Sequence, residues 1–168
     1  QLPDGGWSLF GGTESATASD GTADPDITGM ALQALSKYQD QPLVAQAIQE
    51  ALACMSEQQS TDGGFSSWGT ANAESCVQII VALCELGIDL DDPRFVKNGN
   101  TVLDNLMTFY REGEGFLHTQ SGSGSNQMAT EQGFYALVAA QRAMEGRSSL
   151  YRMSDAISIS DAVETDTA

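Results

Sequence analysis

Basic residues are scarce in this chain of 168 residues: 7 Lys and Arg stand against 23 Asp and Glu, which gives a formal net charge of −16. Proteins bind the phosphates of nucleic acids and of anionic lipids through Lys and Arg, so neither is expected as a partner. No apolar run approaches the length of a membrane-spanning helix, and no transmembrane segment is predicted. The acidity instead predicts a soluble surface that repels its own copies.

Cysteine and histidine are scarce as well. The three cysteines, Cys54, Cys76 and Cys84, form no Cys-x-x-Cys pair, and their odd number argues against a disulfide framework. All three fall in apolar helical patterns, which predicts small buried side chains. The single histidine, His118, has no neighbour at metal-ligand spacing. The sequence therefore predicts neither a metal site nor a cofactor.

The polar and apolar alternation of β-strands is also missing. Five segments instead carry apolar residues at helical spacing, which predicts an all-α fold. Asp24 and Asn72 are the expected N-caps of the first and third helices, and Gly87 is the expected end of the third. The predicted helices cover residues 25–39, 42–58, 73–86, about 100–110 and about 128–144.

A short motif recurs between the helices. Residues 59–65 read Gln-Ser-Thr-Asp-Gly-Gly-Phe, residues 1–7 read Gln-Leu-Pro-Asp-Gly-Gly-Trp, and residues 112–116 are a degenerate third copy. A repeated turn between helices is typical of helical repeat arrays. Its glycine permits the positive φ of a sharp helix exit, its aromatic residue covers the turn, and its glutamine can bind carbonyls left open at the preceding helix end. The residues assigned to these structural roles are Gln1, Gly5, Trp7, Gln59, Gly63, Phe65, Gly115 and Phe116.

The spacing Gln-x-x-x-Gly-x-Trp/Phe resembles the QW repeat of squalene-hopene and oxidosqualene cyclases. The Asp-Gly-Gly-Phe/Trp turns are similar to those of protein prenyltransferase β subunits, the complement thioester domain and the cobalamin carriers (intrinsic factor and transcobalamin). The chain most resembles bacterial prenyltransferase-like domains of surface proteins. This resemblance covers residue 1 to about residue 151. It implies an α/α toroid, and an extracellular or cell-surface location in a bacterium.

In such a toroid, outer and inner helices alternate in antiparallel hairpins around a central cavity. The first, third and fifth helices would then be inner. A complete ring needs more hairpins than this chain supplies, and the chain begins inside a repeat, so we expect an unclosed fragment. Residues 1–153 are expected to form the partial toroid and residues 154–168 a linker or disordered tail. The open flank predicts self-association or pairing with the missing half of the toroid.

Residues 89–92 read Asp-Leu-Asp-Asp and match the letters of the acid motif with which squalene-hopene-type cyclases protonate their substrate. Pro93 follows, and Asp and Pro are typical turn residues, so we interpret this segment as a turn. The zinc set of prenyltransferases requires converging Asp, Cys and His, whereas this chain offers only Cys76 and His118. The Gly-Cys-Gly-Glu-Gln thioester motif is absent. No catalytic residue is predicted.

The predicted inner helices carry acids near their N-termini. Aligning them on residues 34–35, 82–83 and 139–140 brings three carboxylates into one column, which in a toroid would surround the mouth of the cavity. One interpretation is a polar ring for a ligand or cation. The simpler one is that helix dipoles favour acids at these positions. The residues of the ring hypothesis are Asp26, Thr28, Glu74, Gln78, Glu131 and Gln132.

Aromatic residues could line a pocket near this ring, although core packing is their default role. These residues are Trp7, Phe10, Trp68, Phe116 and Phe134. The function expected from the sequence is a non-catalytic ligand-binding or scaffold module of a bacterial surface protein, with a small hydrophobic or corrinoid-like ligand. The alternatives are a terpene cyclase or prenyltransferase-like enzyme whose catalytic residues lie in a missing N-terminal half, and a purely structural spacer.

Overall fold

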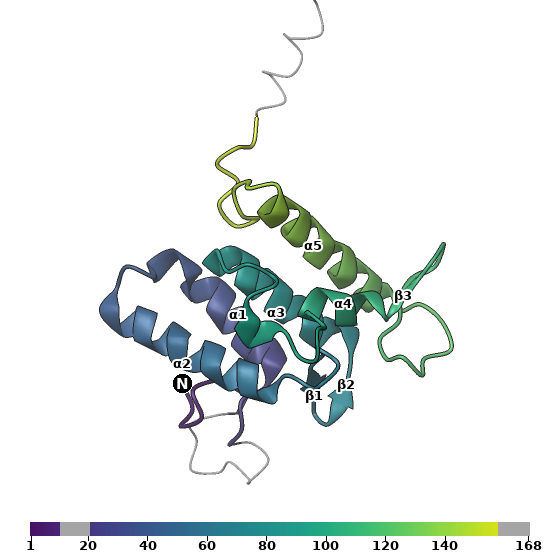
Figure 1. Cartoon of the computed structure of the whole chain (residues 1–168), viewed down its shortest axis with the longest axis horizontal. Coiled ribbons are helices and arrows are strands. Elements are labelled where there is room, and N and C mark those ends of the chain that lie inside the picture. The colour runs from purple at the N-terminus through teal and green to yellow at the C-terminus, as the bar shows by residue number, and fades with distance from the viewer. Residues whose placement is uncertain (11–20, 158–168) are drawn as a thin grey trace, which may run out of the picture.

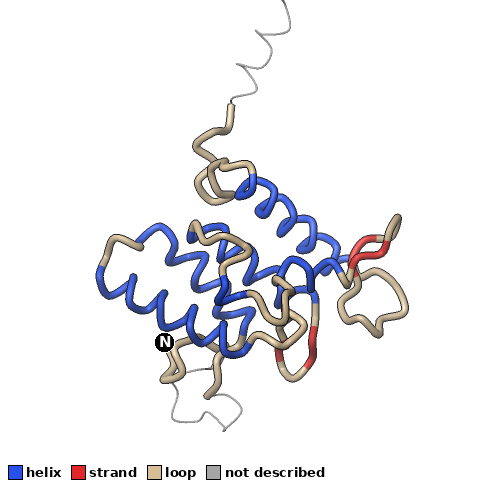
Figure 2. The backbone as a smooth tube through the Cα atoms, viewed as in Figure 1, coloured by secondary structure: helices blue, strands red, loops and turns tan. Residues whose placement is uncertain are grey.

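Helices dominate the computed structural model, which describes residues 1–10 and 21–157 (Figure 1, Figure 2). The predicted helical class is confirmed. Residues 154–157 of the expected tail are exposed, and residues 158–168 lie outside the described residues. The α-helices are α1 (Pro25–Leu35), α2 (Pro42–Gln58), α3 (Ala73–Leu86), α4 (Val102–Met107) and α5 (Gln127–Met144), with short 3-10 helices η1 (Ser36–Tyr38) and η2 (Pro93–Phe95).

The helices begin where the sequence predicts them. Asp24 accepts hydrogen bonds from the backbone N–H groups of the first turn of α1, and Asn72 and Asn126 do the same for α3 and α5. Side-chain oxygens at these positions satisfy N–H groups that have no partner within the helix. At the other end of α3, Gly87 adopts the left-handed conformation with φ 71°, as expected of a helix C-cap glycine.

Two small antiparallel sheets were not predicted. β1 (Ser66–Ser67) pairs with β2 (Thr70–Ala71), and β3 (Tyr110–Arg111) pairs with β4 (Gly115–Phe116). The prediction that the fourth helix continues through Tyr110 is wrong, because α4 ends at Met107 and the chain turns into β3. Strands of two residues are too short to leave an alternating pattern in the sequence.

Helices α1, α3 and α5 lie side by side, with α3 in the middle (Figure 1). All of α3 is buried, which agrees with the apolar residues on every side of this helix. Helix α2 packs on α1, and α4 packs on α3. Cys54, Cys76 and Cys84 are free and buried, as predicted. No helix in the described part of the chain is long and apolar enough to cross a membrane.

The first two copies of the motif form the same turn. Gly5 N–H donates to the Leu2 carbonyl, and Gly63 N–H donates to the Ser60 carbonyl at the equivalent position. Both glycines have positive φ, 97° and 88°, as predicted. The third copy differs: it forms the tip of the β3–β4 hairpin, although Gly115 again has positive φ, 113°.

The motif glutamine does not bind the end of the preceding helix as expected. Gln59 Nε2 donates to the carbonyls of Gly63, in its own turn, and of Phe95, in η2. Gln1 Nε2 donates to the carbonyls of Gly5 and of Ala47, in α2. The reason is the extended backbone of Gln59, with φ −61° and ψ 126°, because the chain has already left the helix at this residue. Each glutamine thus ties its turn to the next hairpin.

Candidate functional site

Two carboxylates, Asp26 and Glu74, lie in the first turns of the neighbouring helices α1 and α3. Glu74 is only 5% exposed, and its Oε2 lies 2.8 Å from Nδ1 of His118. Neither Glu74 Oε1 nor Asp26 Oδ1 has a hydrogen-bond partner among the described residues, although both atoms are buried. A buried acceptor without a partner costs free energy. This pair of acids is therefore ready to accept a hydrogen bond or a positive charge.

The carboxyl of Asp26 has a raised pKa. Burial is the largest cause and raises the pKa of its carboxyl, and the negative charges of Asp24 and Glu74 raise it further. The Ser75 hydroxyl and His118 act in the opposite direction. Both Asp26 and Glu74 lie in the first turns of their helices, so the helix dipole favours them as well.

Glu131 does not join these two acids. The N-caps Asp24, Asn72 and Asn126 are equivalent, so the residue of α5 that corresponds to Asp26 and Glu74 is Met128. Glu131 lies nearly one turn further along α5 and is exposed. The alignment on residues 34–35, 82–83 and 139–140 was three residues out of register for α5, because alanine recurs along that helix and does not fix a unique alignment.

Thr28 has a structural role instead of a place in the ring. It is fully buried, and its Oγ1 accepts from the Trp7 N–H at 2.9 Å and donates to the Trp7 carbonyl at 3.1 Å. Thr130 of α5 makes the same two bonds with Phe116, at 2.9 and 3.4 Å. Both threonines lie four residues after their N-caps, a repeat signal that the sequence contains and the predicted ring overlooks.

Gln78 and Gln132 are brought together, as part of a longer chain of hydrogen bonds. Gln78 Nε2 donates to Gln132 Oε1 at 3.1 Å, and Gln33 Nε2 donates to Gln78 Oε1 at 2.9 Å. Tyr151 donates its hydroxyl to Gln33 Oε1 at 2.7 Å and accepts from the Tyr135 hydroxyl at 2.7 Å. These hydrogen bonds connect α1, α3 and α5 with the segment that follows α5. Gln33, Tyr135 and Tyr151 were not predicted, because each alone resembles an ordinary surface residue.

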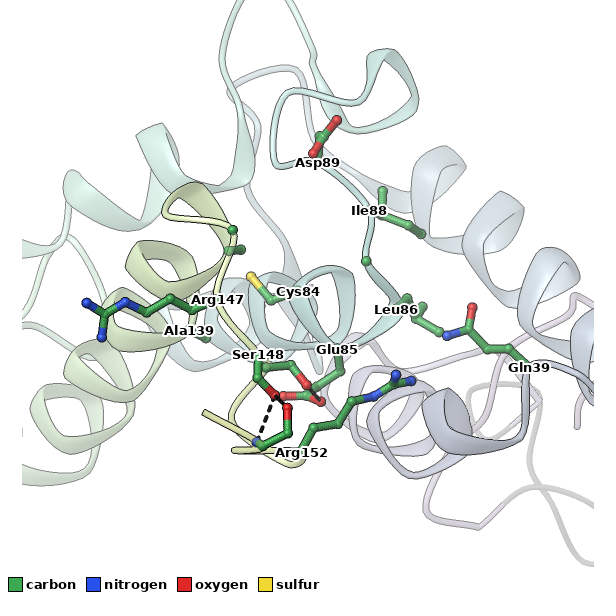
Figure 3. Close-up of a pocket in the computed structure, with 15 residues that line it drawn as sticks. Gln39, Cys84, Glu85, Leu86, Ile88, Asp89, Ala139, Arg147, Ser148 and Arg152 are labelled. Carbon is green, nitrogen blue, oxygen red and sulfur yellow. Dashed lines mark hydrogen bonds between the residues drawn. The ribbon is translucent and has the colours of Figure 1, made fainter. Parts of the chain in front are cut away.

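That segment crosses the C-terminal end of α3. Glu85 is buried there and accepts from the Ser149 hydroxyl at 2.6 Å and from the Tyr151 N–H at 3.1 Å. A pocket of about 600 Å³ lies beside it, and Figure 3 shows Ser148 and Arg152 near Glu85. This pocket is at the opposite end of α3 from Glu74, so it is distinct from the acid pair.

The segment at residues 89–92 is the turn that the sequence predicts. Asp92 accepts from the Arg94 N–H at the start of η2, and its carboxylate forms an ion pair of 2.9 Å with the Arg94 guanidinium. That arrangement holds the pKa of Asp92 below its usual range. A general acid in a cyclase requires the opposite shift. The segment thus shares the amino-acid sequence of the cyclase acid motif but not the raised pKa of its general acid.

A cleft of about 780 Å³ lies beside Asp26. Its apolar lining includes Phe10, Met30 and Trp68, and the rings of Phe10 and Trp68 meet edge to face with centroids 6.4 Å apart. Trp68 is 73% exposed. Of the five aromatic candidates, only these two line the cleft. Trp7 is half-buried, Phe116 is buried in the core, and Phe134 packs edge to face on Phe116 at 6.0 Å.

No group of three or more His, Cys, Asp or Glu side chains in residues 1–10 and 21–157 could hold a metal ion. Glu74 and His118 form a pair, and the buried thiol of Cys76 donates a hydrogen bond to Asn105. Comparison of the chain with protein-family models, curated proteins and solved structures gave no match. What the protein does has to be inferred from the cleft and the residues around it.

Proposed function

We propose that this chain is a non-catalytic binding module, whose ligand is a small molecule with a hydrophobic body. The observation that carries the proposal is the cleft beside Asp26. Sites for small molecules are concave and mostly apolar, with a few polar groups that fix the orientation of the ligand. Here Phe10, Met30 and Trp68 supply the apolar part, and Asp26 supplies a polar group.

The module is proposed to be part of an α/α toroid in a bacterial surface protein. Support comes from the arrangement of α1, α3 and α5 side by side, with α2 on α1 and α4 on α3. The turns at Gly5 and Gly63 support it as well, because they join successive hairpins with the same hydrogen bonds. By resemblance to the cobalamin carriers, a corrinoid is one candidate ligand.

A partner is proposed to cover the free side of α5, the last helix of the row. Met128, Phe134 and Val138 are exposed along this helix. Large apolar side chains in one region of a surface mark an interaction site. The missing part of a toroid, or a second copy of the chain, would bury them.

One observation favours a second candidate function. The raised pKa of Asp26, beside a cleft with aromatic residues, would suit a general acid in a terpene cyclase or prenyltransferase-like enzyme. Such an enzyme would draw its other catalytic residues from beyond this chain. The binding module is preferred because the other carboxylate that lines the cleft, Asp24, already accepts hydrogen bonds from two backbone amides and from the Ser67 hydroxyl.

Native mass spectrometry of the full-length protein tests the proposal. A binding module is expected to retain a small molecule when purified under mild conditions. Turnover of squalene or of prenyl diphosphates, or stoichiometric zinc, would identify an enzyme and contradict the binding module. A protein that retains nothing and converts nothing would be the structural spacer.

A further inference from the structure

We infer that the ligand of this cleft carries a positive charge, and that an organic ammonium group binds between Asp26 and Trp68. The inference rests on the proposed function, since it takes the cleft to be the ligand site. It adds the chemical class of the ligand, which the shape of the cleft alone does not give.

The charges around the cleft carry the first part of the argument. None of the described residues that line it is Lys, Arg or His, whereas Asp24 and Asp26 both line it. Asp24 is already fully engaged: Oδ1 accepts from the amides of Asp26 and Ile27, and Oδ2 accepts from the Ser67 hydroxyl. Asp26 still has an oxygen without a partner in the described chain. That oxygen is itself buried, so Asp26 acts on a ligand in the cleft through its negative charge and not through a hydrogen bond to this atom.

Glu74 adds a second acid near Asp26, and His118 contacts only one of the Glu74 oxygens, Oε2. Glu74 is almost completely buried, and its Oε1 also has no partner in the described parts of the chain. Two acids close enough to raise the pKa of one of them create a negative potential at the cleft. A cation would relieve this repulsion, whereas an anion would increase it. The net charge of −16 draws cations to the surface in the same way.

Trp68 carries the second part of the argument. It lies at the tip of the β1–β2 hairpin with φ 50°, followed by Gly69 with φ 77°. Two-residue turns with positive φ at both positions favour Asn, Asp or Gly at the first, so a tryptophan there is strained. Backbone strain of this kind clusters at functional sites. The strained turn holds a large exposed ring beside Phe10, at the edge of the cleft.

An ammonium group uses both features at once. The faces of aromatic rings attract cations, and a carboxylate pairs with them. A neutral apolar ligand would use Trp68 and Phe10 but would leave the negative charge of Asp26 without a counter-charge. The positive charge thus accounts for both the aromatic and the acidic residues of the cleft.

The test compares choline with 3,3-dimethyl-1-butanol, which has the same shape but a carbon atom in place of the charged nitrogen. Each is titrated into the ¹⁵N-labelled 168-residue chain while the indole N–H signal of Trp68 is followed by NMR. The variant Trp68→Asn, whose new residue tolerates positive φ, identifies this signal against that of Trp7. We expect choline to shift the signal and to bind at least about fivefold more tightly than the alcohol.

Variants show which group recognises the charge. Asp26→Asn is expected to weaken choline binding by at least about fivefold and to leave the alcohol unaffected. The control Asp40→Asn removes the same charge from an exposed residue outside the cleft and is expected to change neither. Dispersed amide signals in each variant show that it folds.

Two results would overturn the inference. If the alcohol binds as tightly as choline, the cleft is a binding site but does not select a positive charge. If neither compound shifts the signal up to about 100 mM, no ammonium group binds there, because that concentration detects even millimolar affinity. In that second case native mass spectrometry still decides the proposed function, since a retained small molecule would support the binding module without an ammonium group.

Discussion

The side chain of Gln59 donates a hydrogen bond of 2.9 Å to the backbone carbonyl of Phe95, 36 residues further along the chain. The same Nε2 also donates to the Gly63 carbonyl at 2.9 Å. Gln1 makes the equivalent pair of bonds, with Gly5 and with Ala47 of α2. The repeated motif is therefore a joint between successive hairpins, and its glutamine carries the connection.

We expect Gln59→Ala to lower the free energy of unfolding by about 2–3 kcal/mol, because it leaves two carbonyls without donors in a buried place. Gln1→Ala is the matched control and is expected to cost about 1 kcal/mol or less, since its bond to Ala47 is exposed. Urea unfolding of both variants measures the difference. Equal losses at the two positions would show that burial does not decide the strength of the joint.

Gly63 gives a second prediction. An added Cβ would lie 2.6 Å from the Thr101 carbonyl oxygen, and φ is 88°. We expect Gly63→Ala to cost about 3 kcal/mol or more, from backbone strain and overlap together. Gly99 has nearly the same φ, 85°, but nothing lies within 4 Å of its Cβ position. Gly99→Ala should therefore cost only about 1 kcal/mol, from strain alone. Similar midpoints of thermal unfolding for the two variants would contradict the close approach of Gly63 to the Thr101 carbonyl.

The sequence predicted the features of the fold that depend on local chemistry. The caps Asp24 and Asn72, the end of α3 at Gly87 and the positive φ of Gly63 follow from residue type and neighbours alone. The burial of α3 between two other helices agrees with the apolar residues on nearly every side of this helix. These signals are local, so one sequence is enough to find them.

The features that failed or were missed depend on contacts between distant segments. The acceptor of Gln59 is the carbonyl of Phe95, and nothing in the sequence identifies a backbone carbonyl as a partner. Gln33 and Tyr151 are 118 residues apart. Glu131 was grouped with the acids by an alignment on alanines, which the cap at Asn126 corrects. The candidate site was thus only partly predicted: Asp26 and Glu74 do interact electrostatically, but the cleft and the exposed Trp68 that lines it required the structure.

The raised pKa of Asp26 predicts how stability depends on pH. Between the unfolded value of 3.8 and the raised folded value, the native state binds more protons than the unfolded state. This carboxyl therefore makes the protein less stable as the pH rises through that range. Asp26→Asn removes the effect, so the variant should be more stable than the wild type at pH 7 and should lose this advantage below about pH 3.8.

Urea unfolding at the two pH values checks this prediction. The gain at neutral pH should be less than about 1 kcal/mol, because Asp26 is partly exposed to solvent. Asp40→Asn is the control and should show no such pH-dependent gain. The opposite result is a variant that is less stable than the wild type at neutral pH and equally stable at acid pH. It would mean that the charged carboxylate of Asp26 stabilises the fold.

The hydrogen-bond chain across the three helices gives a fourth prediction. Tyr151→Phe removes the hydroxyl that joins Gln33 to Tyr135, and we expect a loss of about 1–2 kcal/mol in the free energy of unfolding. Tyr38→Phe, at an exposed tyrosine, should change it by less than about 0.5 kcal/mol. Equal unfolding midpoints for Tyr151→Phe and the wild type would show that the Tyr151 hydroxyl adds nothing to the stability of the fold.

The central claim is that the cleft beside Asp26 and Trp68 is a binding site and that the chain does no chemistry of its own. Native mass spectrometry of the full-length protein and of its Asp26→Asn and Trp68→Asn variants tests it most directly. We predict a bound small molecule in the wild type and in the Asp40→Asn control, and its loss from both cleft variants. A bound molecule that remains in both cleft variants, or turnover of squalene or a prenyl diphosphate by the wild type, would contradict this account.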